Sequence, residues 1–371
     1  MPIRTPRDRT SLILSSAADE DVLVRIGCYT GEPHAGQGIV TARVAVNGSR
    51  IEQVSVTPAE DPSYLAASGG LLYAVGETGD GTMTAFRIAG TALEPVNLVE
   101  TDGADPCHLA VAGGFLIAAN YTSGSAVVRR LRADGGIGER TCLIRHTGRG
   151  PVAGRQDGPH PHMIAPDPRD NRILLVTDLG TDAVCAYRVD QQTGKLALAG
   201  RSGQTGRTGR TDLPPGSGPR HLAFHPAEPF VYVLCELDST LVTCAWDRAA
   251  GQLTPVGRVA AVTGLAGGTA YCSAIRVSPD GRYLYTACRG PDTITVFGLA
   301  NPAAPERAEV VPSGGTSPRD IVLAAGGRLL LCANQESGTV TVLRVDPATG
   351  VPTPTGATLT TPAPVCVLPA Q

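Results

Sequence analysis

The chain lacks the features that would tie it to a membrane or to a nucleic acid. It contains no apolar run long enough for a transmembrane helix. Its N-terminus is basic, but the apolar run that follows, Leu12 to Leu14, is too short for a signal peptide. Lysine and arginine number 31 against 34 acidic residues, which gives a net charge of −3 at pH 7. Without a basic excess, we expect neither a nucleic acid nor a membrane as a partner.

Common catalytic and metal-binding motifs are also missing. We find no G-x-S-x-G elbow, no H-E-x-x-H pair, no Walker A loop and no dinucleotide-binding fingerprint. No cluster of potential metal ligands stands out in the sequence. The sequence therefore predicts no metal site.

The ten cysteines include no C-x-x-C pair, and most lie within apolar runs such as 233–235 and 331–333. Such cysteines are typical of small buried hydrophobes in a reducing cytosol. We therefore predict a cytoplasmic protein, with little support for a disulfide framework or a zinc site.

Sustained helical periodicity is missing along the whole chain, which predicts an all-β fold. The 45 glycines and 30 prolines suit many short strands joined by turns. The hydrophobic content of 42% is enough for a continuous core.

What the chain does contain is a pattern that returns seven times. A proline is followed three residues later by an aliphatic residue, then by a short strand, a tight turn and a second apolar strand. Cys272 replaces the proline in the fifth repeat. The aliphatic positions are Leu65, Leu109, Ile164, Leu222, Ile275, Ile321 and Val367. Their spacing of 44 to 58 residues predicts a β-propeller with one four-stranded blade per repeat.

The two ends of the chain complement each other. Residues 363–368 match only the first strand of a repeat, while 25–30, 38–46 and 50–57 match the second, third and fourth strands. One C-terminal strand joined to three N-terminal strands closes a ring of seven blades and leaves no open sheet edge. We predict a monomeric propeller over residues 22–371, preceded by a disordered polar leader at 1–21.

Two positions of each repeat are expected on one face, near the central channel. The residue after the proline position begins the first strand, and these residues are Ser63, Cys107, His162, Arg220, Ser273, Arg319 and Val365. The residues at the end of the second strand are Cys28, Glu77, Asn120, Asp178, Glu236, Arg289 and Asn334. Six of the seven residues in the second set are polar or charged, although strand ends do not require this.

Charged groups that converge in a mouth lined by apolar strands predict a small-molecule site. Three arginines at these positions, Arg220, Arg289 and Arg319, suit an anionic substrate, because guanidinium groups bind phosphate and carboxylate through paired donors. His162 and Glu236 are the candidates for proton transfer.

Structural roles remain alternatives for several of these residues. His160 or His162 can cap the turn in which both lie, and His221 and His225 fall within a predicted strand, where a structural role is favoured. Glu236 can simply pair with Arg220. Asp178 and Asn334 suit hydrogen bonds at strand ends. The long connections 145–160 and 200–218 are either solvated loops or, for the second, a mobile rim over the site.

Seven segments resemble the seven-bladed lactonase family, which includes the propeller type of 6-phosphogluconolactonase and the fungal carboxymuconate cyclase. They are Gly158–His162, Gly218–Pro226, Leu234–Leu237, Val277–Arg282 with Cys288–Gly290, and Ser317–Asp320 with Ala333–Gln335. The resemblance runs from about Arg25 to the C-terminus.

This resemblance implies a cofactor-free hydrolase that opens a sugar lactone. The catalytic residues of the family correspond to His162, Arg220, Glu236 and Arg289, with Arg276 as a second possibility for the later arginine. The other residues expected to bind substrate are Arg319, Arg276, His160, Asn334, Asp178, Glu77 and Asn120. The first two blades lack the Pro-Asp-Gly turn and the 200–218 insert is long, which puts the substrate's size in question.

The favoured reaction converts 6-phosphogluconolactone to 6-phosphogluconate. His162 or Glu236 would activate water, Arg289 or Arg220 would stabilise the oxyanion, and the remaining arginines would hold the phosphate. Two alternatives remain: a cyclase that acts on a muconate-type dicarboxylate, and a non-catalytic propeller that binds a partner.

Overall fold

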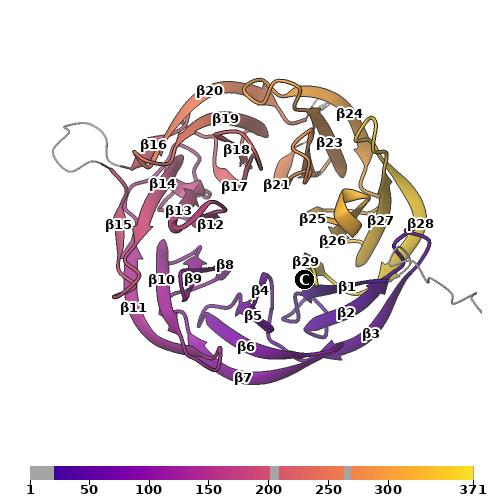
Figure 1. Cartoon of the computed structure of the whole chain (residues 1–371), viewed down its shortest axis with the longest axis horizontal. Coiled ribbons are helices and arrows are strands. Elements are labelled where there is room, and N and C mark those ends of the chain that lie inside the picture. The colour runs from indigo at the N-terminus through magenta and orange to yellow at the C-terminus, as the bar shows by residue number, and fades with distance from the viewer. Residues whose placement is uncertain (1–20, 201–208, 263–268, 371) are drawn as a thin grey trace, which may run out of the picture.

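A computed structural model of the chain describes residues 21–200, 209–262 and 269–370. In this part of the chain, seven antiparallel sheets stand around a common axis like the blades of a propeller (Figure 1). The predicted seven-bladed fold and its ring closure are confirmed. The predicted leader lies almost entirely outside the described residues, and the propeller begins at Val22.

The blades follow one another along the chain, and we number them as the repeats. Blade one contains β4 (Leu65–Ser68), β5 (Leu71–Gly76), β6 (Thr82–Ala89) and β7 (Ala92–Glu100). Blade two contains β8 (Pro106–Ala112), β9 (Phe115–Asn120), β10 (Ser125–Leu131) and β11 (Ile137–Arg145). Blade three contains β12 (Pro161–Asp167), β13 (Asp170–Asp178), β14 (Ala183–Val189), β15 (Leu196–Leu198) and β16 (Arg210–Asp212).

The second half of the ring repeats this order. Blade four contains β17 (Pro219–Phe224), β18 (Phe230–Cys235), β19 (Thr240–Asp247) and β20 (Gln252–Ala260). Blade five contains β21 (Tyr271–Val277), β22 (Tyr283–Arg289), β23 (Thr293–Gly298) and β24 (Glu306–Pro312). Blade six contains β25 (Pro318–Ala324), β26 (Leu329–Asn334), β27 (Thr339–Val345) and β28 (Pro352–Thr360). Blade seven contains β29 (Pro364–Pro369), β1 (Val22–Cys28), β2 (Ile39–Val44) and β3 (Ile51–Thr57).

Blade three departs from the four-strand rule. Both β15 and β16 pair with β14, at its C-terminal and N-terminal halves respectively. The insert predicted at 200–218 begins after β15 and includes β16. Its residues 201–208 are outside the described part of the chain. Two short 3-10 helices, η1 (Leu179–Thr181) and η2 (Ala325–Gly327), complete the structure. No helix in the described ranges is long and apolar enough to cross a membrane.

The core lies between neighbouring blades. Every residue of β26 is buried, because the strand is covered on both faces, whereas only Pro352 and Leu359 are buried in the outer strand β28. Val24 and Val40 of blade seven belong to the same apolar cluster as Leu331 and Val340 of blade six. Burial of one such aliphatic side chain stabilises the fold by about 1.5–3 kcal/mol. The ring is therefore held together by contacts that every blade makes on both sides.

A β-bulge interrupts the pairing of the first and second strands in six blades. In blade two, Pro106 pairs with Asn120 and His108 with Ala119, so that Cys107 between them has no partner. The bulges at the other positions involve His162, Arg220, Ser273–Ala274, Arg319 and Val365. A bulge adds a residue to one strand and re-aims its side chain. In these six blades, the residue after the proline or cysteine position thus departs from the regular alternation of its strand.

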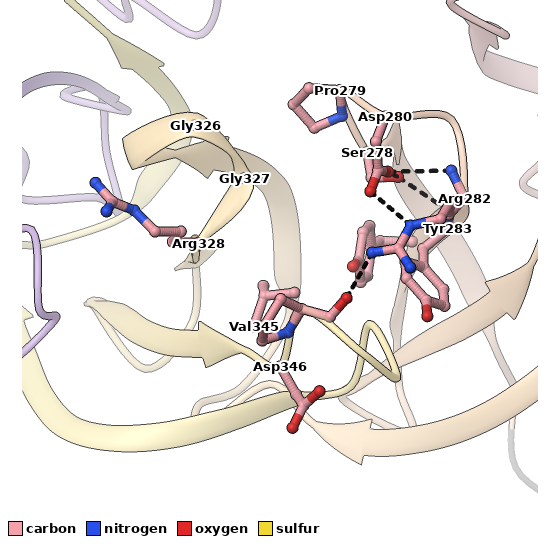
Figure 2. Close-up of a pocket in the computed structure, with 12 residues that line it drawn as sticks. Ser278, Pro279, Asp280, Arg282, Tyr283, Gly326, Gly327, Arg328, Val345 and Asp346 are labelled. Atoms are coloured by element: carbon pink, nitrogen blue, oxygen red, sulfur yellow. Dashed lines mark hydrogen bonds and ion pairs between the residues drawn. The ribbon is translucent and has the colours of Figure 1, made fainter.

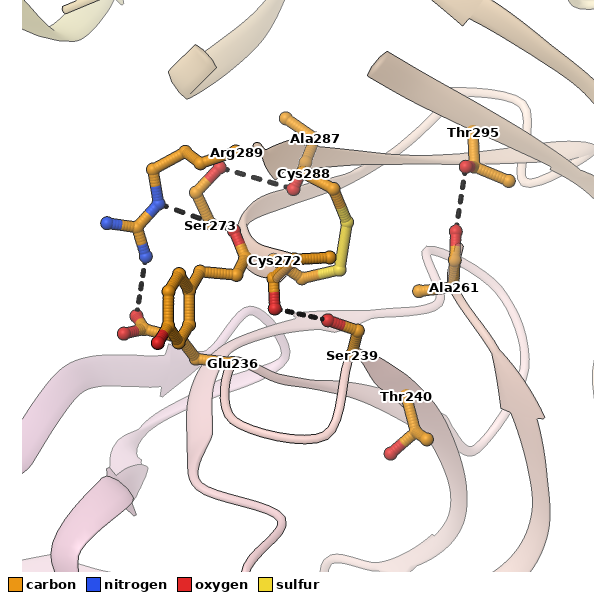
Figure 3. The surroundings of a disulfide bond; sticks show 12 residues. Glu236, Ser239, Thr240, Ala261, Cys272, Ser273, Ala287, Cys288, Arg289 and Thr295 are labelled. Atoms are coloured by element: carbon orange, nitrogen blue, oxygen red, sulfur yellow. Dashed lines mark hydrogen bonds and ion pairs between the residues drawn. A yellow bond between two sulfur atoms is a disulfide. The ribbon is translucent and has the colours of Figure 1, made fainter. Parts of the chain in front are cut away.

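One pair of cysteines contradicts the prediction made from the cysteine pattern. Cys272 and Cys288 form a disulfide between β21 and β22 (Figure 3). Cys272 occupies the proline position of its repeat and pairs directly with Cys288 across the strands, which brings the two thiols face to face. The other eight cysteines are unpaired, and all but Cys142 are buried as predicted.

Candidate active site

A cavity of about 150 Å³ lies where the inner ends of the blades meet. Nine residues line it: Glu77, Cys107, Tyr121, Arg155, His162, Arg220, Glu236, Arg289 and Arg319. Four arginines face two glutamates, so the lining carries two excess positive charges when His162 is neutral. This balance favours an anionic ligand.

Four lining residues come from the bulges. Cys107, His162, Arg220 and Arg319 each follow the proline of their repeat and have no partner in the strand pairing. Four of the seven residues in the first predicted set, those of blades two, three, four and six, therefore line the cavity. The bulge explains why a residue from the innermost strand can turn into the channel mouth.

Four more lining residues share one position at the end of the second strand. To find this position, we take the residue of the second strand that pairs with the aliphatic repeat residue and count three residues onward. In blade one, Ala74 pairs with Leu65, and the position is Glu77. The seven residues at this position are Tyr29, Glu77, Tyr121, Leu179, Glu236, Arg289 and Gln335. Glu77, Tyr121, Glu236 and Arg289 line the cavity.

The sequence-based alignment of this second ring was off by one residue in four blades. It placed Cys28, Asn120, Asp178 and Asn334 in the ring, each one residue before the equivalent position. Consecutive strand residues face opposite sides, so a slip of one residue selects the wrong side chain. The four residues lie outside the cavity lining.

Three of these displaced residues make internal hydrogen bonds. The Asn120 side chain donates to the Thr101 carbonyl at 3.2 Å, and the Asn334 side chain donates to Thr341 Oγ1 at 3.2 Å. Asp178 lies 2.7 Å from His146 Nδ1 and also accepts from the backbone at the start of η1. The structure gives all three the role of strand-end hydrogen-bonding groups, the alternative considered for Asp178 and Asn334.

Glu236 is the centre of the charge cluster. Its carboxylate pairs with Arg155, with Arg220 Nε at 2.9 Å and with Arg289 Nη2 at 2.8 Å. Figure 3 shows Arg289 reaching Glu236 from beside the disulfide. Arg220 Nε and Arg289 Nη2 are close to the carboxylate but poorly aligned for a hydrogen bond, so these contacts are ion pairs. Both arginines retain donor capacity toward a ligand.

The protonation of Glu236 follows from these contacts. Burial opposes its ionisation, but the charges of Arg289, Arg220 and Arg155 outweigh burial and lower its pKa to about 2. The carboxylate is therefore ionised near neutral pH. A carboxylate held this strongly is a poor proton acceptor.

His162 has the opposite electrostatic setting. Burial and the positive charges of Arg220 and Arg319 lower its pKa well below the usual value. Its Nδ1 lies 3.8 Å from Cys107 Sγ, and burial raises the pKa of that thiol. The ring of Tyr121 meets His162 edge-on at 5.5 Å. The result is a neutral imidazole at the wall of a cavity that four arginines also line.

Arg319 forms a smaller group on the other side of the cavity. Its Nη2 donates to the Tyr29 hydroxyl at 2.7 Å and lies 3.9 Å from Glu77 Oε1. Gln335 accepts a long hydrogen bond from the same guanidinium at 3.5 Å. Tyr29 and Gln335 occupy the same repeat position as Glu77, which places three side chains of one ring around Arg319.

Two other predicted residues lie outside the cavity lining. Arg276 forms an ion pair with Asp320 at 2.9 Å. His160 stacks on Tyr121 with ring centroids 4.4 Å apart, and its Nδ1 is 2.9 Å from the Tyr121 carbonyl. His160 thus supports a lining residue without being one itself.

The remaining histidines in predicted strands have structural contacts. His225 Nδ1 accepts from the backbone of Ala227 and Glu228, and its Nε2 lies 3.1 Å from the Gly281 carbonyl. His221 Nε2 lies 3.2 Å from Arg220 Nη1, next to the cavity. The structural role favoured for His225 is therefore confirmed.

Sequence reasoning missed three lining residues. Cys107 was in the first ring but was not chosen, and Tyr121 would have followed from the correct register. Arg155 carries no repeat signal, because it lies on the 145–160 connection rather than on a blade. It crosses to Glu236 in blade four.

Another cavity of similar volume lies at the seam of blades five and six (Figure 2). Two of its four charged residues pair with each other: Asp280 accepts from Ser278 and Arg282, and Arg282 also donates to the Pro347 carbonyl. This seam has no convergence of charges comparable to that at the channel mouth.

Comparison with known proteins agrees with this geometry. The family model described as "Lactonase, 7-bladed beta-propeller" matches residues 23–369. The chain belongs to this family. It is 35% identical over 251 residues to the 6-phosphogluconolactonase of Bacillus subtilis, across 67% of this chain and 68% of that protein.

Two solved structures share the fold closely. A candidate 6-phosphogluconolactonase of Bacteroides fragilis has a TM-score of 0.87 and 28% identity, with 96% of this chain and 99% of that chain covered. A periplasmic gluconolactonase of Pseudomonas aeruginosa has a TM-score of 0.86 and 27% identity, with 95% and 99% covered. Membership of the lactonase family makes the chain a lactone-hydrolysing enzyme.

Proposed function

We propose that the chain hydrolyses 6-phosphogluconolactone to 6-phosphogluconate, with His162 as the general base. The observation that carries the proposal is a neutral, buried imidazole in a cavity whose lining has two excess positive charges. The Bacillus subtilis relative supports the choice of a phosphorylated sugar lactone.

The proposed reaction needs no group beyond these side chains. Water attacks the lactone carbonyl while His162 accepts one of its protons, which forms a tetrahedral oxyanion. The imidazolium then returns the proton to the ring oxygen as the carbon–oxygen bond breaks. His162 thus ends the cycle neutral, and one water has been added across the ester.

Arg289 and Arg220 are proposed to stabilise the oxyanion. Both guanidinium groups lie against Glu236 but keep donors that are not aligned with it. Fixed donors aimed at a developing negative charge lower the barrier without reorganisation during the reaction. Glu236 serves to hold the arginines in place, since its carboxylate is already paired with Arg155, Arg220 and Arg289.

The test is hydrolysis of freshly prepared 6-phosphogluconolactone, followed against its spontaneous rate with and without a chelator. Unphosphorylated gluconolactone is the control substrate. Fast turnover of the phosphorylated lactone that a chelator does not slow would support the proposal. Turnover of the unphosphorylated lactone alone, or no turnover above background, would overturn it, and muconate-type diacids would then be tested.

Cellular location and oligomeric state are part of the same proposal. We propose a cytoplasmic monomer, since seven unpaired cysteines are buried as in reduced proteins. The alternative is an oxidising compartment, which the disulfide between Cys272 and Cys288 and the periplasmic location of the Pseudomonas aeruginosa relative would fit. Cell fractionation decides the compartment, and light scattering of the purified chain decides the number of subunits.

A further inference from the structure

Arg155 differs from the other arginines of the cavity in where it comes from. Arg220, Arg289 and Arg319 lie at repeat positions of the blades, whereas Arg155 lies on the connection between β11 and β12. It is also the most exposed of the four: its side chain is 34% exposed, against 4% for Arg220 and 19% for each of the other two. Arg155 is therefore the cation nearest to solvent.

The connection holds Arg155 in place through its neighbour. Gln156 is fully buried, and its side chain donates to the Leu179 carbonyl at 2.8 Å and to Asp182 Oδ1 at 2.7 Å. Asp182 also accepts from the backbone of Gly216 and Gly218, which lead into blade four. One buried amide thus fixes the loop to blades three and four, and the adjacent side chain is presented over the cavity.

The contacts of Arg155 leave it free to exchange partners. It pairs with Glu236, and its guanidinium lies 5.4 Å above the ring of Tyr271. If Arg155 turns away, Glu236 loses the hydrogen bond from Arg155 but keeps its ion pairs with Arg220 and Arg289. An anion that enters the mouth can therefore recruit Arg155 without leaving Glu236 unpaired.

We propose that Arg155 selects substrates that carry an anionic group at the end remote from the lactone carbonyl. The proposal rests on the proposed function, which brings the carbonyl to the buried His162. The opposite end of the same molecule must then extend toward the solvent-facing side of the cavity, where Arg155 lies. A phosphate at that end would bind through paired guanidinium donors. Gln156 acts as the positioning residue of this contact.

The test compares two lactones that differ only in the phosphate. In Arg155→Gln, KM for 6-phosphogluconolactone is expected to rise by about 10- to 100-fold, the cost of one charge-assisted hydrogen-bonded contact. The value of kcat, and the kcat/KM for unphosphorylated gluconolactone, are expected to change by less than about threefold. Equal losses on both substrates, or no change on either, would overturn the proposal.

Three further variants separate selection from folding and from net charge. Arg149→Gln removes the same charge from an exposed position of the same loop and is expected to leave both substrates unchanged. Arg155→Lys is expected to recover part of the preference for the phosphorylated lactone. Gln156→Ala is expected to lower that preference without a change of charge, whereas a purely structural role would lower both activities equally.

Binding of the reaction products gives a readout that does not depend on hydrolysis. Calorimetric titration with 6-phosphogluconate and with gluconate is carried out on the wild type, Arg155→Gln and Arg149→Gln. If the wild type hydrolyses neither lactone but Arg155→Gln alone loses affinity for 6-phosphogluconate, the proposed function fails and the anion contact stands. If hydrolysis is robust and Arg155→Gln binds 6-phosphogluconate as the wild type does, the contact fails and the function stands.

Discussion

Glu236 and Glu77 occupy the same repeat position in blades four and one, yet their surroundings differ. Glu236 pairs with three arginines, two of them at 2.8 and 2.9 Å, and only 5% of its side chain is exposed. Glu77 has Arg319 at 3.9 Å, and 17% of its side chain is exposed. The strands that carry them lie on opposite sides of the ring (Figure 1). The propeller thus supplies equivalent positions, and the residues of neighbouring blades give each position its chemistry.

This difference divides the cavity into two parts. On the Glu236 side, one carboxylate pairs with three arginines. On the Glu77 side, Arg319 is held by hydrogen bonds to the neutral side chains of Tyr29 and Gln335. His162 reaches the cavity from blade three and is influenced by arginines of both sides. We expect catalysis and charge stability to depend mostly on the Glu236 side.

The largest effect is expected from His162→Asn. General-base catalysis contributes roughly 10²- to 10⁴-fold, so kcat should fall by that factor while the fold is kept. The depressed pKa of His162 also predicts that the acid limb of the wild-type pH–rate profile lies well below pH 6.5. His160→Asn is the matched control, because His160 lies two residues away and outside the lining. Full activity in His162→Asn would remove the imidazole from the mechanism.

The next effect is expected from Glu236→Gln. Breaking a buried charge cluster by removal of one partner typically costs about 3–5 kcal/mol, because the remaining charges lose their compensation. Here Arg220 and Arg289 would face each other without the carboxylate between them. Urea unfolding should show the loss of stability, and kcat should fall because both oxyanion donors are displaced. If Glu236→Gln were as stable and as active as the wild type, the division of the cavity into two unequal parts would be wrong.

Much of the fold could be predicted from the sequence because the repeat is short and each blade is built alike. The aliphatic positions, such as Leu109 and Ile164, fixed the number of blades and the closure of the ring. The bulge residues of five blades are among the predicted ring positions because they directly follow the proline of their repeat.

The rest of the site depends on details that the repeat does not carry. The end of the second strand has no fixed marker residue, so a slip of one position selected Asn120 rather than Tyr121. Arg155 could not be predicted, because a loop's path depends on tertiary contacts such as those of Gln156 with Asp182. The disulfide depended on the same register: Cys272 and Cys288 are directly opposite only when the bulge is counted.

A smaller effect is expected when the stabilities of the wild type and Glu236→Gln are compared as a function of pH. The pKa of Glu236 is about 2 in the folded chain, below its usual value of about 4.5. A depressed pKa adds stability above the unfolded value, and this contribution is lost as pH falls from about 4.5 toward about 2. The stability difference between wild type and Glu236→Gln should therefore narrow below about pH 4.5. A constant difference down to pH 3.5 would contradict the assigned ionisation.

The smallest effect is expected from Glu77→Gln, the same change at the same repeat position as Glu236→Gln. At 3.9 Å and partly exposed, the Glu77–Arg319 pair should contribute no more than about 1 kcal/mol to the free energy of unfolding. Arg319 keeps its hydrogen bonds to Tyr29 and Gln335 in the variant, so its position should change little. One fewer negative charge should also strengthen the binding of 6-phosphogluconate slightly, as calorimetry can measure. A loss of stability or activity as large as that of Glu236→Gln would mean that the repeat position, rather than its neighbours, determines the chemistry.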